Sequence, residues 1–255
     1  MTYKVWILRA PGTNCDQETK YCVEYFGVNA DVIHIKKLLE AKNSLSKIDG
    51  LIIPGGFSFG DHIRAGALFG KIIKEKLGDT LETLDEDGKP ILGICNGFQV
   101  LIECGLLPDR ETNSALTTNL SSKFECRWVD LRVENSHCIF TKGLEKTISL
   151  PVAHGEGRFL AKDADVKNIM ESDRAVLTYA GLNGSKAKGI YPHNPNGSIE
   201  DIAAVCNPTG NVFGLMPHPE RAFHGFTSPR WSGEESNKFG DGYNIFKNMV
   251  DYIKK

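Results

Sequence analysis

The chain has 255 residues, of which 41% are hydrophobic, and a formal net charge of −2 at pH 7. A chain of this length can bury a full core, and we expect a single domain over residues 1–255. The nearly balanced charge gives no electrostatic case for binding nucleic acid or an anionic membrane. No apolar run approaches the roughly 20 residues that span a bilayer, and the seven cysteines include no Cys-x-x-Cys pair. These features predict a soluble, cytoplasmic protein without disulfides or a metal site.

The first half of the sequence alternates apolar strands with helices. Continuous apolar runs predict buried strands at residues 5–8, 31–35, 50–53 and 90–94. Helical spacing and end signals predict helices at residues 16–26 and 65–76 and from residue 97 up to Gly105. Because strands that are buried on both faces read as continuous apolar runs, this order favours a parallel sheet covered by helices.

The second half has a different pattern. Alternation at residues 129–133 and short candidates at 147–152, 176–179, 202–205 and 212–216 predict further strands, and the last helix is expected at 241–253. Two long polar stretches, 183–198 and 224–242, are candidate lids or docking surfaces. We therefore expect a three-layer α/β fold: a mostly parallel open sheet with helices on both faces and a small antiparallel extension.

The most informative motif is GICNG at residues 93–97, at the end of a predicted strand. Gly-x-Cys-x-Gly is the cysteine form of a nucleophile elbow, a strained turn from a strand into a helix. A side chain at Gly93 or Gly97 would collide as strand and helix close on each other. The helix N-terminus favours thiolate over thiol. We therefore expect Cys95 to be a nucleophile, and the flanking glycines disfavour the alternative of a buried structural cysteine.

A thiol nucleophile needs a base and a group that orients the base. The motif MPHPE at residues 216–220 directly follows an apolar strand candidate. Its prolines should hold the segment extended, so that His218 and Glu220 project to the same side. A carboxylate beside an imidazole fixes its tautomer and stabilises the imidazolium. We expect His218 to be the base and Glu220 its orienter; the alternative is a surface His-Pro turn with a solvated glutamate.

Acyl transfer also needs donors for an oxyanion. The PGG motif at residues 54–56 follows the third strand, and bare backbone N–H groups at Gly55 and Gly56 can approach an oxyanion closely. The Asn96 N–H, next to the nucleophile, can supply a second donor. A phosphate-binding loop is excluded because neither Gly-Lys-Ser/Thr nor G-x-G-x-x-G is present there. An ordinary tight turn is the remaining alternative.

Together these motifs resemble those of the class I (triad) glutamine amidotransferases. Within that class the chain is similar to the PurQ-type glutaminase subunits of phosphoribosylformylglycinamidine synthase. The resemblance extends over nearly the whole chain, on PGTNCD at 11–16, GGFSFGD at 55–61, CNGFQ at 95–99, PVAHGEG at 151–157, residues 196–205 and MPHPER at 216–221. Phe59 and His62 depart from it, standing where tyrosines are frequent in the family.

The resemblance implies the flavodoxin-like fold of that class and a glutaminase reaction. Cys95 would attack the side-chain amide of glutamine, ammonia would leave, and water would hydrolyse the γ-glutamyl thioester. Gln99, one helical turn beyond Cys95, would contact the bound glutamine. Another wall of the pocket would come from His154, Gly155, Glu156 and Gly157. For His154 and Glu156 a structural hydrogen-bonded pair is an equal alternative. Arg64 and Arg221 are assigned to an interface or to site architecture.

The resemblance also implies partners. Ammonia would pass to a larger, PurL-type synthetase subunit, which aminates ATP-activated formylglycinamide ribonucleotide to formylglycinamidine ribonucleotide in de novo purine synthesis. A small PurS-type accessory subunit is expected as well. No cofactor is expected in this chain, since ATP and magnesium belong on the synthetase subunit. Three alternatives stay open: the glutaminase subunit of another amidotransferase, a γ-glutamyl hydrolase or cysteine peptidase of related fold, and a catalytically silent scaffold.

Overall fold

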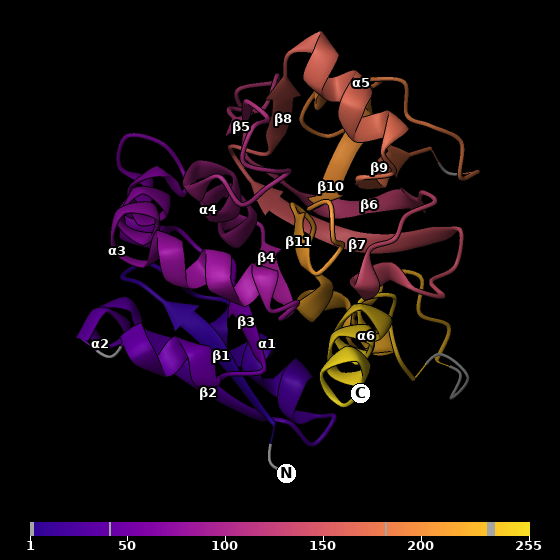
Figure 1. Cartoon of the computed structure of the whole chain (residues 1–255). Helices are drawn as coiled ribbons and strands as arrows, with labels where there is room; N and C mark the ends of the chain where they lie inside the picture. Colours follow the sequence, from indigo (N-terminus) through magenta and orange to yellow (C-terminus); the bar gives the residue numbers. More distant parts are fainter. Residues whose placement is uncertain (1–2, 41, 182, 234–237) are drawn as a thin grey trace.

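The computed structural model of the chain describes residues 3–40, 42–181, 183–233 and 238–255 (Figure 1). Its centre is a nine-stranded sheet in the order β2-β1-β3-β4-β11-β10-β9-β6-β7. The strands are β1 (Lys4–Arg9), β2 (Asn29–His34), β3 (Gly50–Ile53), β4 (Ile91–Ile94), β6 (Glu125–Val133), β7 (Thr147–His154), β9 (Ala175–Ala180), β10 (Ile202–Cys206) and β11 (Val212–Leu215). The α-helices are α1 (Asp16–Glu24), α2 (Ile35–Glu40), α3 (Ala67–Glu86), α4 (Asn96–Cys104), α5 (Asp163–Glu171) and α6 (Tyr243–Ile253).

The strands β2, β1, β3, β4 and β11 are parallel and form one half of the sheet. In the strand order β2-β1-β3-β4, the chain moves from β1 through α1 toward one edge of the sheet, and from β3 through α3 toward the other edge. Right-handed crossovers therefore put α1 and α3 on opposite faces. α4 packs beside α3, and α6 beside α1. The predicted three-layer α/β fold is thus confirmed.

The strands β10, β9, β6 and β7 continue the same sheet with antiparallel pairing. This extension was predicted, but it contains as many strand pairings as the parallel half. β7 alternates buried and accessible residues along its length, as expected for a strand with one covered face. A separate two-stranded sheet pairs β5 (Ser114–Thr117) with β8 (Arg158–Ala161), which the sequence patterns did not predict.

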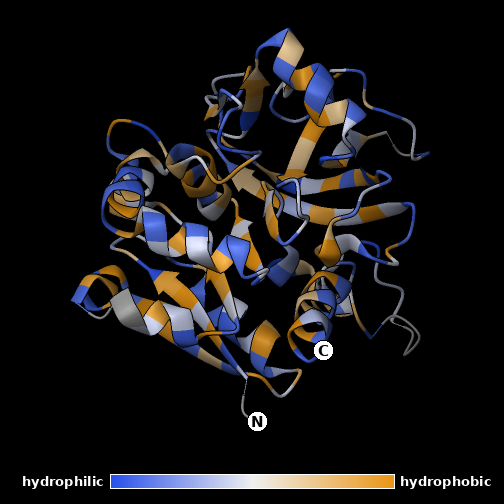
Figure 2. Cartoon of the chain, viewed as in Figure 1, coloured by the Kyte–Doolittle hydropathy of each residue, from blue (hydrophilic) through white to orange (hydrophobic). Residues whose placement is uncertain are grey.

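Apolar residues concentrate in the central strands, while the helices alternate polar and apolar faces (Figure 2). Every residue of β3, β4 and β11 is buried. Phe98 of α4 stacks on Phe159 with ring centroids 6.5 Å apart, which ties α4 to β8. The turn after β4 therefore lies beside fully buried strands.

Three helices differ from the sequence prediction. The helix expected at residues 65–76 runs on to Glu86, because Leu77, Leu81 and Leu84 continue the buried face at helical spacing. The short helix α2 and the helix α5 were not predicted. None of the helices in the described residues combines the length and apolar character that a membrane crossing needs.

The two long polar stretches have different outcomes. Asn196 and Ser198 bond to β8 and to the residue before it: Asn196 Nδ2 donates to the Gly157 carbonyl (2.8 Å), and the Phe159 N–H donates to Ser198 Oγ (3.0 Å). This end of the 183–198 stretch is therefore fastened to the fold. In the 224–242 stretch, residues 234–237 lie outside the described residues. The single domain over residues 1–255 stays a prediction.

Candidate active site

Cys95 occupies a strained turn between β4 and α4, with φ 50° and ψ −104°. A positive φ at a non-glycine residue costs on the order of 1–3 kcal/mol and persists only where neighbours hold it. The Cys95 N–H donates to the Leu215 carbonyl of β11 (2.8 Å), and its own carbonyl accepts the Gln99 N–H (3.1 Å). The sheet on one side and the helix on the other thus fix the thiol in position.

The glycines on either side of Cys95 allow this turn. A Cβ on Gly97 would overlap the Ile53 carbonyl oxygen of β3, and one on Gly93 would lie 2.7 Å from the Gly97 carbonyl oxygen. Both conflicts are with backbone atoms, which cannot move aside cheaply. The close approach predicted from the two glycines is confirmed.

His218 and Glu220 form a buried pair. His218 Nδ1 lies 2.6 Å from Glu220 Oε1, and the two side chains are 2% and 0% exposed. The His218 N–H donates to the Pro151 carbonyl of β7 (2.8 Å), which anchors the segment. His218 itself is extended, as expected, with φ −106° and ψ 92°. The expectation is wrong beyond it, where Pro219 begins a 3₁₀ helix, Pro219–Ala222, and this turn brings the carboxylate to the imidazole.

Charge around His218 favours its protonated form. Burial lowers the pKa of His218, but electrostatic attraction to Glu220 and to Cys95 outweighs burial and holds this pKa well above its usual range. Glu220 occupies Nδ1, so Nε2 is the nitrogen left for the Cys95 proton. Nε2 is buried and has no hydrogen-bond partner among the described residues. The Cys95 thiol points instead to the Ala153 carbonyl (3.7 Å), so proton transfer requires the thiol to turn.

Cys95 and His218 line one cavity of about 200 Å³. Its rim carries two half-exposed aromatic side chains, Phe57 and Phe124, stacked with ring centroids 6.4 Å apart. The cavity lies at the carboxyl ends of the parallel strands, where open α/β sheets bind ligands. The full lining is Asn14, Gly56, Phe57, Cys95, Phe124, Cys126, Ala153, His218 and Arg221.

The paired glycines after β3 have different roles. Gly56 lines the cavity, and within the described residues neither its N–H nor that of Asn96 has a hydrogen-bond acceptor. Both amides are therefore available to an oxyanion. Gly55 provides clearance, because a Cβ there would lie 2.8 Å from His218 Cε1. The N–H of Gly55 also has no acceptor among the described residues, and its place in an oxyanion pocket stays a prediction. Its carbonyl accepts the Cys15 N–H (3.2 Å).

Gln99 is buried beneath the nucleophile and does not line the cavity. Its Oε1 accepts a hydrogen bond from Asn96 Nδ2 (2.9 Å), and its Nε2 donates to the Glu156 carbonyl. Asn96 Nδ2 also contacts Asp61 Oδ1 (3.4 Å). Burial, reinforced by the charge of Glu156, raises the pKa of Asp61 to about 6. The contact of Gln99 with glutamine stays a prediction.

The segment 154–157 lies beside this network and also outside the cavity lining. His154 Nδ1 is 3.1 Å from Asn119 Oδ1, which also accepts the Gly157 N–H (3.0 Å). Burial lowers the pKa of His154 to about 3, so the imidazole is neutral near pH 7. Glu156 Oε2 accepts the Ala65 N–H (3.1 Å). His154 and Glu156 thus have separate partners rather than each other, and their role in a glutamine pocket stays a prediction.

Cys15 is a neighbour of the site to which the sequence motifs assigned no role. Its Sγ lies 4.0 Å from His218 Nδ1, and Arg221 Nη2 donates to it (3.2 Å). Burial raises the pKa of the Cys15 thiol, which therefore carries its proton. Ligand atoms of Cys15, His218 and Glu220 all lie within 4.8 Å of one another, a grouping that could hold a metal ion. The three residues come from two distant segments, so no ligand spacing in the sequence could reveal it.

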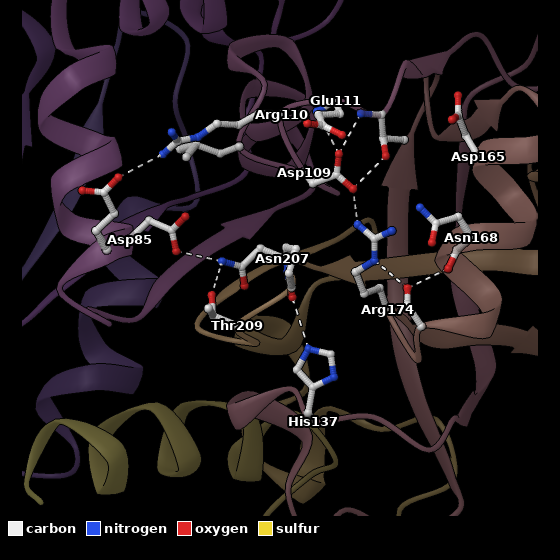
Figure 3. A pocket seen from close by; sticks show the side chains of 15 residues that line it. Asp85, Asp109, Arg110, Glu111, His137, Asp165, Asn168, Arg174, Asn207 and Thr209 are labelled. Atoms are coloured by element: carbon white, nitrogen blue, oxygen red, sulfur yellow. Dashed lines mark hydrogen bonds and ion pairs between the residues drawn. The ribbon is translucent and has the colours of Figure 1, made fainter.

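A larger depression of about 810 Å³ lies at the other end of the parallel strands from Cys95 (Figure 3). This depression borders the turn that leads into the amino end of β11, which begins at Val212. Cys95, in contrast, follows the carboxyl end of β4. Two pairs of polar side chains lie in the depression: Arg174 with Asp109, and Asn207 Nδ2 with Asp85 Oδ1 (2.7 Å). No cysteine lines it, so it lacks the nucleophile chemistry of the smaller cavity.

Comparisons with known proteins agree with this chemistry. A family model described as the CobB/CobQ-like glutamine amidotransferase domain matches residues 2–253. The phosphoribosylformylglycinamidine synthase subunit PurQ of Archaeoglobus fulgidus is 44% identical over 271 residues, which cover 99% of this chain and 97% of that protein. The chain belongs to the PurQ family of glutamine amidotransferases. PurQ proteins of Methanococcus maripaludis and Dehalococcoides mccartyi are each 40% identical, with 99% of this chain and 98% of theirs covered.

Solved structures support the same assignment. A chain of the structure described as PurLQS from Thermotoga maritima matches with a TM-score of 0.73 and 37% identity over 99% of both chains. A glutamine amidotransferase from Thermotoga maritima has a TM-score of 0.60 at 14% identity, covering 99% of this chain and 98% of that one, and shows the fold alone. The predicted glutamine amidotransferase family and its fold are confirmed.

Proposed function

We propose that this chain is the glutaminase subunit of a phosphoribosylformylglycinamidine synthase. It releases ammonia from glutamine for a PurL-type synthetase subunit, which uses ATP and magnesium to convert formylglycinamide ribonucleotide to formylglycinamidine ribonucleotide. A PurS-type subunit completes the assembly, and the complex is cytoplasmic. Membership of the PurQ family and the match to a chain of PurLQS support this proposal.

The observation that carries the chemistry is the buried His218–Glu220 pair beside the Cys95 elbow. His218 takes the thiol proton through Nε2, and Cys95 attacks the side-chain carbonyl of glutamine. The N–H groups of Gly56 and Asn96 stabilise the oxyanion of the tetrahedral intermediate.

Collapse of the intermediate breaks the carbon–nitrogen bond. The imidazolium of His218, stabilised by Glu220, gives its proton to the leaving nitrogen, and ammonia departs. His218 then removes a proton from water, which attacks the γ-glutamyl thioester and releases glutamate. Each cycle returns Cys95 to the thiol, so this chain needs no cofactor for its step.

Replacement of Cys95 by alanine tests the division of labour. The variant is combined with its synthetase partner and assayed with glutamine and, separately, with ammonium chloride. We expect loss of glutamine-dependent synthesis with ammonia-dependent synthesis retained. Loss of both activities in a correctly assembled complex would contradict the proposal. Substrates of other amidotransferases, folate polyglutamates and peptides serve as controls, and turnover of any of these in place of the ribonucleotide would favour a rival function.

A further inference from the structure

Cys15, His218 and Glu220 bring together a sulfur, a nitrogen and an oxygen ligand. Cys15 Sγ is 4.0 Å from His218 Nδ1, which is 2.6 Å from Glu220 Oε1, and all three residues are buried. Thiolate, imidazole and carboxylate are the donors that bind Zn²⁺ in proteins. The separations are close to those between ligands of one tetrahedral ion, so small shifts suffice to coordinate it.

An unsatisfied group at this cluster independently points to a ligand. Glu220 Oε2 is buried in a side chain with no exposed surface, and it has no hydrogen-bond partner among the described residues. An unpaired buried carboxylate oxygen is costly, and a cation would offset that cost. His218, Asn14 and Arg221 line the catalytic cavity, which gives an ion a route to the cluster.

We propose that Cys15, His218 and Glu220 form an inhibitory site for a thiophilic divalent cation such as Zn²⁺ or Cd²⁺. The cation takes the place of the proton between Nδ1 and Oε1. A bond forms between the metal and Cys15 Sγ, and the thiol proton leaves to solvent. An imidazolium loses its Nδ1 proton to solvent and keeps the proton on Nε2, whereas in a neutral imidazole the displaced Nδ1 proton moves to Nε2.

That tautomer explains the inhibition. A neutral imidazole carries one N–H, and coordination at Nδ1 forces it onto Nε2. Nε2 is the nitrogen that accepts the Cys95 proton in the proposed reaction, so the base is blocked without any metal contact to Cys95. The inhibition rests on the proposed function, whereas the binding does not.

Arg221 opposes the cation. Its guanidinium contacts the Cys15 sulfur at 3.2 Å and brings a positive charge to the place where the metal would bond. The Arg221 side chain is 38% exposed, so it can turn into solvent. Removing this charge with Arg221→Ala should tighten cation binding by about tenfold.

Binding is measured first on Cys95→Ser protein, which removes the catalytic thiol as a rival ligand. Cd²⁺ is titrated while the ultraviolet thiolate-to-cadmium absorption is recorded, and Zn²⁺ is titrated by calorimetry. We expect one ion per chain. Adding Cys15→Ser should weaken binding by about 100-fold or more and abolish the absorption, and adding Glu220→Gln should weaken it by at least about tenfold. Cys126→Ser is the matched control for metal binding, because Cys126 lines the same cavity but lies outside the cluster; it should leave Cd²⁺ and Zn²⁺ binding unchanged.

An inhibition assay completes the test. Zn²⁺ should inhibit the glutaminase activity of the unmodified chain reversibly, and Cys15→Ser should raise the inhibitory concentration at least about tenfold. Thermal unfolding shows whether each variant folds. If the Cys15→Ser protein does not fold, Glu220→Gln carries the binding test in its place. Binding that survives Cys15→Ser, binding that depends on Cys126, or no binding to the Cys95→Ser protein would each overturn the proposal.

Discussion

The imidazole of His218 and the carboxylate of Glu220 meet at 2.6 Å between Nδ1 and Oε1, although a 3₁₀ turn rather than an extended strand joins them. Because both side chains are buried, water does not screen this pair. The contact fixes the tautomer of His218 and leaves Nε2 for the Cys95 proton. Proton transfer in the proposed reaction depends on this relationship.

The first prediction compares the two members of that pair. His218→Ala should lower kcat for glutamine hydrolysis by about 10³-fold or more, because it removes the proton carrier. Glu220→Gln should cost less, about 10²-fold, since it removes only the orienting charge. Steady-state kinetics of ammonia release measure both. Equal losses, with both variants folded, would contradict the division of roles.

The second prediction concerns the elbow glycines. Gly97→Ala should destabilise the chain by about 3 kcal/mol or more or prevent folding, because its Cβ overlaps the Ile53 carbonyl oxygen. Gly78→Ala, in the interior of α3, is the matched control. Nothing lies within 4 Å of its Cβ, so it should stabilise the chain by about 0.5–1 kcal/mol. Urea unfolding measures both changes, and a Gly97→Ala protein of unchanged stability would refute this account of the turn.

The third prediction is a pH dependence from His154. Burial lowers the pKa of His154 from 6.5 to about 3, so between these values the unfolded chain binds a proton that the folded chain does not. Stability therefore falls as the pH drops below about 6.5, with His154 contributing about 1.4 kcal/mol per pH unit. His154→Gln should unfold more easily at pH 7.5 but show a shallower loss between pH 6.5 and 5. If the free energy of unfolding falls equally for both proteins between pH 6.5 and 5, this role is excluded.

The fourth prediction has the opposite sign. The pKa of Asp61 is raised from 3.8 to about 6, so the folded chain holds its proton more tightly than the unfolded chain. Asp61 therefore destabilises the fold as the pH rises through this range, and the penalty remains above it. Asp61→Asn should raise the free energy of unfolding at pH 7.5 by about 1 kcal/mol, a value reduced because the side chain is only half buried. The gain should shrink at pH 4; a gain independent of pH would point to another cause.

Much of the fold was predictable because its signals are local. The buried strands β3, β4 and β11 read as continuous apolar runs, and the glycines around Cys95 report a close approach that the structure contains. The sequence prediction ends α3 too early, before Gly78, whereas Leu81 and Leu84 keep the helix packed beyond it.

The rest of the site depends on contacts between distant segments. The Gly55 carbonyl accepts the N–H groups of Asn14 and Cys15, and the PGTNCD motif does not reveal that contact. The partners of Gln99 and His154 are likewise set by the packing of α4 and β7 against other segments. Spacing along a sequence carries no information about such contacts.

The most direct test of the central claim is to identify which cysteine reacts with a substrate analogue. The chain contains seven cysteines, and both Cys15 and Cys126 lie close to the proposed nucleophile's cavity. The purified protein is treated with 6-diazo-5-oxo-L-norleucine, a glutamine analogue that alkylates nucleophilic thiols, and its peptides are mapped by mass spectrometry. We predict one adduct per chain, on Cys95, and none on the Cys95→Ala protein. An adduct on Cys15 or Cys126, or unmodified Cys95 after loss of glutaminase activity, would contradict the account.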